Sequence, residues 1–222
     1  MKMSERLSKI ISLVPKWANV ADVGSDHCLV PLGLLARGEV GFLQAIDNKI
    51  GPYNNMEKAV IEAGQEDRIS LSLSSGLNCL NETVNTLVIA GMGGALTLKI
   101  LNEGKEKLDR IEYIITDPHK DLVSSRKGIV ALGYFIEEEE IVFEDGLYYF
   151  LTRFKKGKAG EYSDKDYLFG PIIRKKRPNL YKKYLLDQKQ KVKAILEKPL
   201  SIDARHRYDV YLNKINEELR GD

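Results

Sequence analysis

The chain has 222 residues, of which 43% are hydrophobic and 30% are charged, an ordinary composition for a soluble protein with a sizeable core. No apolar run is long enough to span a bilayer, which argues against a membrane protein. The amphipathic N-terminus does not resemble a secretion signal. Cys28 and Cys79 have no metal-ligand spacing. We therefore expect no metal, no membrane contact and a reduced, cytoplasmic setting.

The net charge of +2 hides an uneven distribution of charge along the chain. From Lys155 onward there are 18 Lys and Arg against 10 Asp and Glu, whereas the preceding part has 16 against 22. Basic segments attract phosphate backbones through counterion release. A Lys-rich helix is also a common solvated surface, so the charge favours a nucleic-acid partner only when it accompanies a nucleotide-binding fold.

The acidic part alternates between strand-like and helix-like hydrophobic patterns, which is typical of a doubly wound α/β fold. Its last two strand candidates are joined by a hairpin signal, Glu144-Asp145-Gly146, so we expect one reversed strand near the edge of a mostly parallel sheet. A terminal hairpin indicates the seven-stranded class I methyltransferase variant of the Rossmann-like sheet. The predicted strands are 18–23, 42–47, 68–73, 86–90, 112–116, 135–143 and 147–154, and the predicted helices are 30–37, 53–64, 95–103 and 122–132.

The basic part is predicted to begin with a linker over 155–166 and to become helical after Pro171. Lys198-Pro199 ends this helix, because the residue before proline is disfavoured in the helical region. Asp203 is the expected N-cap of a second helix, and the two helices should form an antiparallel pair. We therefore predict a methyltransferase-like domain over 1–157 and a helical extension over 158–222.

The segment ADVGSDH (21–27) follows the first predicted strand and precedes the first predicted helix. An acid ends the strand and Gly24 permits a tight turn, as at the nucleoside-binding corner of a doubly wound fold. The GxGxxG pyrophosphate motif is absent, so a cofactor without phosphates fits better. S-adenosylmethionine is such a cofactor, and Asp22, Gly24 and Asp26 are suited to hold it. The alternative is a plain strand-to-helix turn.

Three further segments end predicted strands at the same edge of the sheet. Asp47 lies 25 residues after Asp22, near the spacing at which a carboxylate accepts hydrogen bonds from ribose hydroxyls, although it could simply cap a helix. The glycine-rich AGMGG (90–94) would allow a ligand to approach the backbone, or would serve as a flexible connector. Asp117-Pro118-His119 could contact substrate or simply start a turn.

The segments ADVGSDHCLVP (21–31), GPY (51–53), AGMGG (90–94), KL (107–108) and FGP (169–171) together resemble the bacterial tRNA (adenine-22-N1)-methyltransferase family, over nearly the whole chain. The resemblance implies a class I methyltransferase domain, a coiled-coil-like C-terminal extension, S-adenosylmethionine as methyl donor and tRNA as partner, with the protein a monomer or weak dimer. It implies cofactor binding by Asp22, Gly24, Ser25, Asp26, Asp47, Asn48, Ser75, Gly76, Ala90, Gly91, Met92 and Gly93. Asp26 and His27 are the candidate catalytic residues, and Asp117, His119, Arg174, Lys175, Lys176, Arg177, Lys182 and Lys183 are the candidate tRNA contacts.

The chain departs from the family pattern at three places. Ser74-Ser75 replaces Gly-Asp after the third strand, Asp47 replaces Glu after the second, and Asp117-Pro118-His119 replaces a Gln-Pro-Asn-like tripeptide. These changes leave two alternatives open. One is a methyltransferase that acts on another substrate, and the other is a tRNA-binding protein with weakened or lost catalysis.

Overall fold

The computed structural model describes residues 3–158 and 160–221; residues 1–2, 159 and 222 of the predicted domains lie outside the described residues. The chain divides into two compact units, Met1–Glu161 and Tyr162–Asp222. The predicted boundary after residue 157 falls close to this division. No helix among the described residues is long and apolar enough to cross a membrane.

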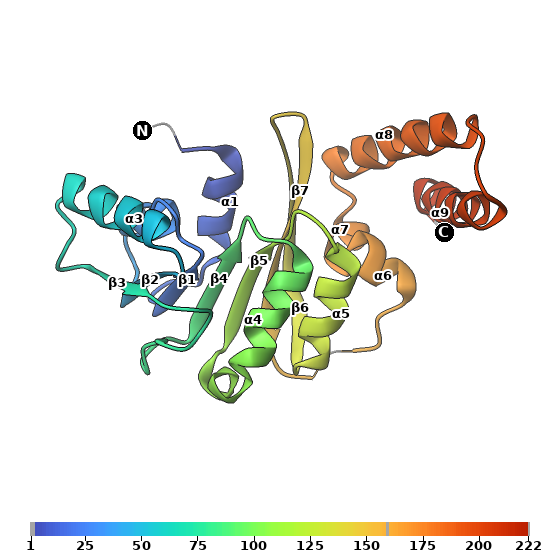
Figure 1. Cartoon of the computed structure of the whole chain (residues 1–222). Helices are drawn as coiled ribbons and strands as arrows, with labels where there is room; N and C mark the ends of the chain where they lie inside the picture. Colours follow the sequence, from blue (N-terminus) through green and yellow to red (C-terminus); the bar gives the residue numbers. More distant parts are fainter. Residues whose placement is uncertain (1–2, 159, 222) are drawn as a thin grey trace. The chain divides into compact units, whose positions relative to one another are not determined.

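The first unit contains a seven-stranded sheet with the order β3-β2-β1-β4-β5-β7-β6 (Figure 1). The pairs among β1 to β5 are parallel, whereas β7 is antiparallel to both of its neighbours, which confirms the predicted reversed strand beside an edge. This is the mostly parallel sheet with a reversed strand that the sequence predicts. The strands are β1 (Val20–Val23), β2 (Leu43–Asp47), β3 (Ile69–Leu73), β4 (Thr86–Ala90), β5 (Tyr113–Asp117), β6 (Tyr134–Glu144) and β7 (Leu147–Lys156).

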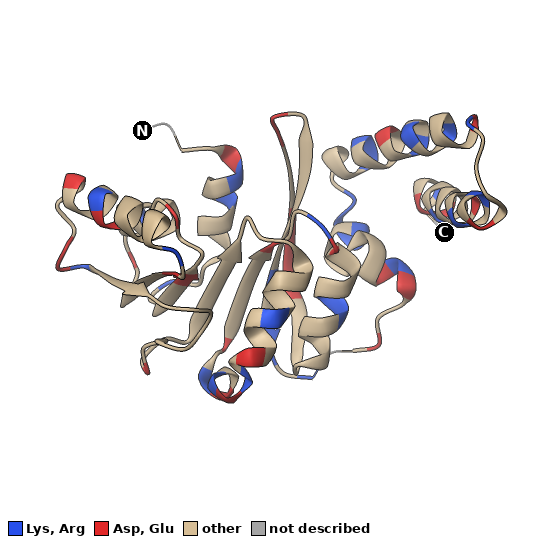
Figure 2. Cartoon of the chain, in the orientation of Figure 1, with Lys and Arg blue, Asp and Glu red and all other residues tan. Residues whose placement is uncertain are grey.

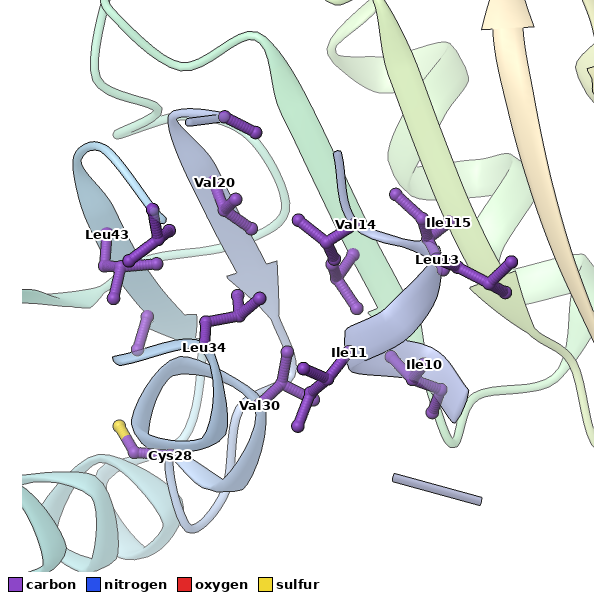
Figure 3. Close-up of a cluster of buried hydrophobic side chains, with 14 of the residues drawn as sticks. Ile10, Ile11, Leu13, Val14, Val20, Cys28, Val30, Leu34, Leu43 and Ile115 are labelled. Carbon is purple, nitrogen blue, oxygen red and sulfur yellow. The ribbon is translucent and has the colours of Figure 1, made fainter. Parts of the chain in front are cut away.

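Helices cover both faces of this sheet, which is why all four residues of β1 are buried. The helices of this unit are α1 (Glu5–Leu13), α2 (Leu29–Arg37), α3 (Ile50–Glu62), α4 (Gly94–Glu103), the 3-10 helix η1 (Lys105–Arg110) and α5 (Leu122–Ala131). Figure 1 shows α4 and α5 together on one face. On the other face, α1, α2 and α3 bury a continuous apolar cluster against the strands (Figure 3).

Helix α1 was absent from the predicted elements, although it contributes much of that cluster. Ile10, Ile11 and Leu13 are almost completely buried, and Ser4 caps the helix by accepting a hydrogen bond from the Leu7 backbone. Burial of one such aliphatic side chain contributes about 1.5–3 kcal/mol. The helix is therefore anchored to the sheet by its apolar face, and the residues at its start, Arg6 and Leu7, line a cavity at the carboxyl edge of the strands.

The β6–β7 hairpin extends past the end of β5. Pairing between β5 and β7 stops at Thr116 and Thr152, but β6 and β7 remain paired as far as Glu144 and Leu147. Helix α1 contacts this overhang, where the Glu5 backbone N–H donates to the Glu144 carboxylate at 3.0 Å. The overhang and α1 together form a wall at the carboxyl edge of the sheet.

The second unit is helical, and its details correct the sequence prediction in three places. Its helices are α6 (Asp164–Phe169), α7 (Pro171–Lys176), α8 (Asn179–Leu196) and α9 (Ile202–Arg220), and α8 packs against α9. The predicted linker already contains the start of α6. The single helix predicted after Pro171 is broken at Arg177, because Pro178 disfavours the helical conformation there. Ser201, not Asp203, caps α9, since its hydroxyl accepts from the Ala204 backbone.

Candidate active site

The turn after β1 is the centre of the candidate site. Gly24 has a φ of +82°, and its backbone N–H donates to the Ile46 carbonyl at 2.7 Å, which ties the turn to β2. A Cβ atom at this position would lie 2.1 Å from the Met92 methyl carbon. The positive φ therefore requires glycine, whereas the Met92 methyl group lies at the end of a flexible side chain that can move aside.

One cavity lies on the β2 side of this turn and has a volume of about 150 Å³. It brings together the ends of β1, β2, β3 and β4, so the carboxyl edge of the parallel strands forms its base, as expected for this class of sheet. Polar and apolar groups alternate around it. The lining residues are Val23, Gly24, Ile46, Asp47, Asn48, Ser74, Ser75, Gly76, Met92, Leu96, Lys99, Ile100 and Glu103.

A second cavity, of about 240 Å³, shares Gly24 with the first and opens toward α1. Unlike the first cavity, it contains an Arg and two Asp side chains from different elements. Its lining residues are Ser4, Arg6, Leu7, Asp22, Gly24, Ser25, Asp26, His27, Leu29, Val30 and Ala90. The two cavities flank one glycine and offer space for an elongated ligand with two chemically different ends.

Asp22 is the most electrostatically perturbed acid of the site. Its side chain is at the end of β1 and only 5% of the residue is exposed. Burial raises the pKa of the Asp22 carboxyl to about 6. Burial, and next the nearby Asp22 charge, also raise the pKa of the Cys28 thiol to about 12, so this thiol stays protonated. A cationic ligand group beside Asp22 would compensate the buried negative charge of the Asp22 carboxylate.

Asp26 and His27 lie at the exposed rim of the second cavity. The Asp26 carboxylate accepts a hydrogen bond from the Asn55 amide at 2.9 Å, and the His27 Nε2 lies 3.7 Å from the other Asp26 oxygen. Both side chains are more than half exposed, at 53% and 59%. Both side chains are therefore accessible to solvent where they line the cavity.

Asp117 and His119, at the end of β5, form a cluster with a residue that sequence reasoning missed. Arg6 of α1 donates from Nε to Asp117, and its Nη2 lies 3.0 Å from His119 Nε2. The Arg6 guanidinium also lies 4.6 Å from the centre of the Tyr149 ring. Arg6 belongs to no motif, and 111 residues separate it from Asp117, so only the amphipathic pattern near the N-terminus offered a signal.

The four predicted residues at the end of β4, 90–93, have different surroundings. Ala90 and Met92 line the second and the first cavity respectively, whereas Gly91 and Gly93 lie beside these linings. A Cβ atom on Gly91 would lie 3.5 Å from Arg6 Nη2, so Gly91 lies next to the Arg6 cluster. Gly93 is the N-cap of α4.

Two of the predicted tRNA-contacting cations of the second unit, Arg174 and Arg177, bond within that unit, although Arg177 is also exposed. Arg174 donates to Glu218 at 2.9 Å and to Asp166, and Arg177 donates to the Glu218 backbone carbonyl at 2.7 Å. These arginines therefore join α6 and α7 to α9. The exposed residues in the predicted set are Lys175, Lys176, Arg177, Lys182 and Lys183.

Within residues 3–158 and 160–221, no three His, Cys, Asp or Glu side chains are grouped so that they could hold a metal ion.

Residues 3–152 match the family described as "Methyltransferase domain". The chain is 29% identical over 203 residues to the tRNA (adenine(22)-N(1))-methyltransferase of Bacillus subtilis (strain 168), covering 89% of this chain and 85% of that protein. A Streptococcus pneumoniae structure, described as a candidate tRNA (m1A22) methyltransferase in complex with S-adenosyl-L-methionine, is 31% identical with a TM-score of 0.90, over 98% of this chain and 100% of that chain. A structure of M. capricolum TrmK in complex with S-adenosyl-homocysteine is 25% identical with a TM-score of 0.87, over 100% of this chain and 99% of that chain.

Proposed function

The chain belongs to the methyltransferase-domain family, as a TrmK-like class I member, and from this premise we propose that it methylates N1 of adenine 22 in tRNA, with S-adenosylmethionine as donor. One observation carries the proposal. The chain matches a donor-bound relative along nearly its full length, and it has two adjoining cavities at the same carboxyl edge of the sheet. The agreement includes the helical unit, which a small-molecule methyltransferase would not need.

The lining residues fit the donor. When bound, S-adenosylmethionine supplies a methyl group that is activated by attachment to a sulfonium. Asp47 is suited to accept hydrogen bonds from ribose hydroxyls, and Ser75 and Gly76 border the same cavity. Gly24 allows the backbone to approach the ligand closely, and the buried Asp22 carboxylate is suited to an ammonium group. We propose that these residues bind the donor.

The reaction depends on alignment of adenine N1 with the methyl carbon more than on proton transfer. Adenine N1 has a lone pair and carries no proton before the transfer, so it can attack the methyl carbon without a general base. Correct alignment can contribute about 7–11 kcal/mol toward lowering the barrier. We propose that Asp26 and His27, at the cavity rim, face the adenine. The Asp26 carboxylate would stabilise the positive charge that develops on the base.

The target adenine must leave its stack before N1 can reach the cavity, at a cost of a few kcal/mol. The helical unit has the charge needed to bind the tRNA backbone while this happens. We propose that its exposed lysines, with Lys175, Lys176 and Lys182 as the first candidates, contact phosphates and recognise charge and shape rather than base sequence. We further propose that the protein works in the cytoplasm, as a monomer or weak dimer.

Incubation with labelled S-adenosylmethionine and an unmodified tRNA transcript, followed by nucleoside mapping, tests the proposal. We expect 1-methyladenosine at position 22 and no product from a transcript that carries guanine there. Asp22→Asn is the matched control, because it removes one charge without changing the size of the side chain. Donor binding without any methylated tRNA would contradict the proposal and would favour the reading in which catalysis is lost or another substrate is used.

A further inference from the structure

The Asp26 carboxylate, at the rim of the second cavity, is hydrogen-bonded on one side only. Its Oδ1 accepts a hydrogen bond from the Asn55 side-chain amide at 2.9 Å. Its Oδ2 lies 3.7 Å from His27 Nε2, which is too far for a hydrogen bond. Among the residues that the structure describes, no Lys or Arg forms an ion pair with Asp26. Because the side chain is 53% exposed, Oδ2 remains available as an acceptor for a ligand.

Asn55 holds this carboxylate without neutralising it. A carboxylate can only accept hydrogen bonds, so the Asn55 amide must direct its nitrogen toward Oδ1. Asn55 belongs to α3, and its neighbour Met56 is completely buried, which anchors this turn of the helix to the sheet unit. A neutral amide orients the carboxylate and leaves its negative charge in place, whereas a Lys or Arg partner would compensate that charge. The pair therefore presents an oriented anionic acceptor at the cavity rim.

The edge of adenine that is methylated has a donor that matches this acceptor. The exocyclic amino group is attached to C6, the ring atom next to N1, so N1 and the amino group lie on the same edge of the base. When the N1–carbon bond forms and the carbon–sulfur bond of the donor breaks, the positive charge passes to the base and is shared between N1 and the amino nitrogen. A hydrogen bond from this amino group to a carboxylate is therefore stronger in the transition state than in the substrate. Guanine has an oxygen at C6 and would meet the carboxylate with a second acceptor.

We propose that Asp26 Oδ2 accepts a hydrogen bond from the amino group of the target adenine, and that Asn55 is the positioning residue that aims Asp26 at this group. The inference rests on the proposed function, because it presupposes that adenine N1 receives the methyl group. It provides a physical basis for the choice of adenine over guanine. It assigns Asp26 to the base rather than to the donor, which the sequence had also indicated, and it adds α3 to the elements that recognise the substrate.

Methylation of two tRNA transcripts under single-turnover conditions tests the contact. One transcript has adenine at position 22, and the other has purine there, which keeps the N1 lone pair but lacks the amino group. We expect Asp26→Asn to slow methylation of the adenine transcript about 10- to 100-fold, the range for a lost hydrogen bond to a charged group, and to slow the purine transcript much less. Comparing variant and wild type on each transcript cancels the intrinsic difference in reactivity between the two bases.

Titration calorimetry with S-adenosylmethionine accompanies this measurement. We expect the affinity of Asp26→Asn for the donor to equal that of the wild type, because the carboxylate is assigned to the base. An unchanged affinity also shows that the variant is folded.

Variants of Asn55 test the positioning role. Asn55→Ala should lower kcat on the adenine transcript by less than Asp26→Asn does and leave KM for tRNA unchanged, because the carboxylate remains but is no longer oriented. Asn55→Gln should recover part of this loss, since it restores an amide donor on a longer side chain. Asn54→Ala removes an exposed amide from the same turn of α3 and is the matched control, with activity equal to the wild type.

Equal losses of Asp26→Asn on the adenine and purine transcripts would overturn the inference, because the amino group would then not be the contact. A weakened affinity of this variant for S-adenosylmethionine would also overturn it, by placing Asp26 at the donor. An Asn55→Ala enzyme that matches the wild type, or that differs only in KM for tRNA, would refute the positioning role. A wild-type protein that methylates neither transcript would overturn the proposed function itself, which keeps the two failures distinct.

Discussion

At the scale of single residues, the site contains a carboxylic acid at a buried position, where burial disfavours its charged form. Asp22 is buried at the end of β1, and this burial raises its pKa from 3.8 to about 6. A buried acid with a raised pKa binds protons more tightly in the folded state than in the unfolded state. Its contribution to stability is therefore lost as the pH rises from about 4 to 6, and the loss stays constant above that window.

Asp22→Asn should therefore stabilise the ligand-free protein at pH 7. A shift from 3.8 to about 6 corresponds to about 3 kcal/mol, an upper bound on the gain in the free energy of unfolding. Urea unfolding across pH 4 to 7 would measure it, and we expect the gain to shrink toward zero near pH 4. Asp67→Asn removes an exposed carboxylate and should change little. A gain independent of pH would show that ionisation of Asp22 is not its cause.

At the scale of secondary structure elements, a buried ion pair connects α5 to β6, the first strand of the hairpin. Arg126 Nη2 lies 2.8 Å from Glu139 Oε1, and neither side chain is more than 1% exposed. Removing one partner of a buried pair leaves an uncompensated charge, which typically costs about 3–5 kcal/mol. Replacement of both partners by apolar groups costs far less, because no charge remains to be desolvated.

Arg126→Met should lower the free energy of unfolding by about 3 kcal/mol or more, and Arg126→Met combined with Glu139→Leu should recover most of this loss. Denaturant unfolding of both variants and the wild type completes the comparison. If the double variant is as unstable as the single one, packing around Arg126 matters more than its charge.

Most elements of the sheet unit could be predicted from sequence because hydrophobic periodicity and turn residues are local signals. The reversed strand near the edge of the sheet followed from the Glu144-Asp145-Gly146 hairpin signal, whereas the order of the strands was not predicted. Helix α1 was missed although Ser4 and its amphipathic pattern are local signals, and its role could not be predicted because it depends on contacts with residues more than 100 positions away, as between Arg6 and Asp117. The break at Arg177 was readable from Pro178 but was missed, because the apolar spacing continues across it.

The same distinction holds for the candidate site. Asp22, Asp47 and Met92 were identifiable because each lies at or just after the end of a strand, and the carboxyl ends of parallel strands meet at one edge. The structure brings all three into the linings of the two cavities. Lys99 and Glu103 also line the first cavity, but they come from the exposed side of α4, where sequence spacing predicts only a solvated surface.

At the scale of the whole molecule, charge is divided between the two units. Blue Lys and Arg bands recur along α8 in Figure 2, and the part from Lys155 onward has 18 basic residues against 10 acidic ones. Arg174 is part of the internal ion pairs of its unit, so it is a poor target for testing RNA binding. The exposed lysines of α7 and α8 are better targets, because their removal leaves the helix packing intact.

Changing Lys175, Lys176 and Lys182 together to Gln should weaken tRNA binding and reduce its dependence on salt. Each lost phosphate contact should lower the slope of log affinity against log salt by about 0.7–0.9. The same charge change at Lys16, Lys58 and Lys105, which are exposed in the sheet unit, is the matched control. Filter binding at several salt concentrations provides the slopes, and identical slopes for all three proteins would remove these lysines from the RNA interface.

The contact between α1 and the β6–β7 hairpin has a consequence for protein synthesis. Arg6 is translated before Asp117 and Tyr149, which hold it, because 111 residues separate it from Asp117 and Tyr149 follows later still. During synthesis, the amphipathic segment that becomes α1 therefore cannot complete its contacts until the β6–β7 hairpin has been translated.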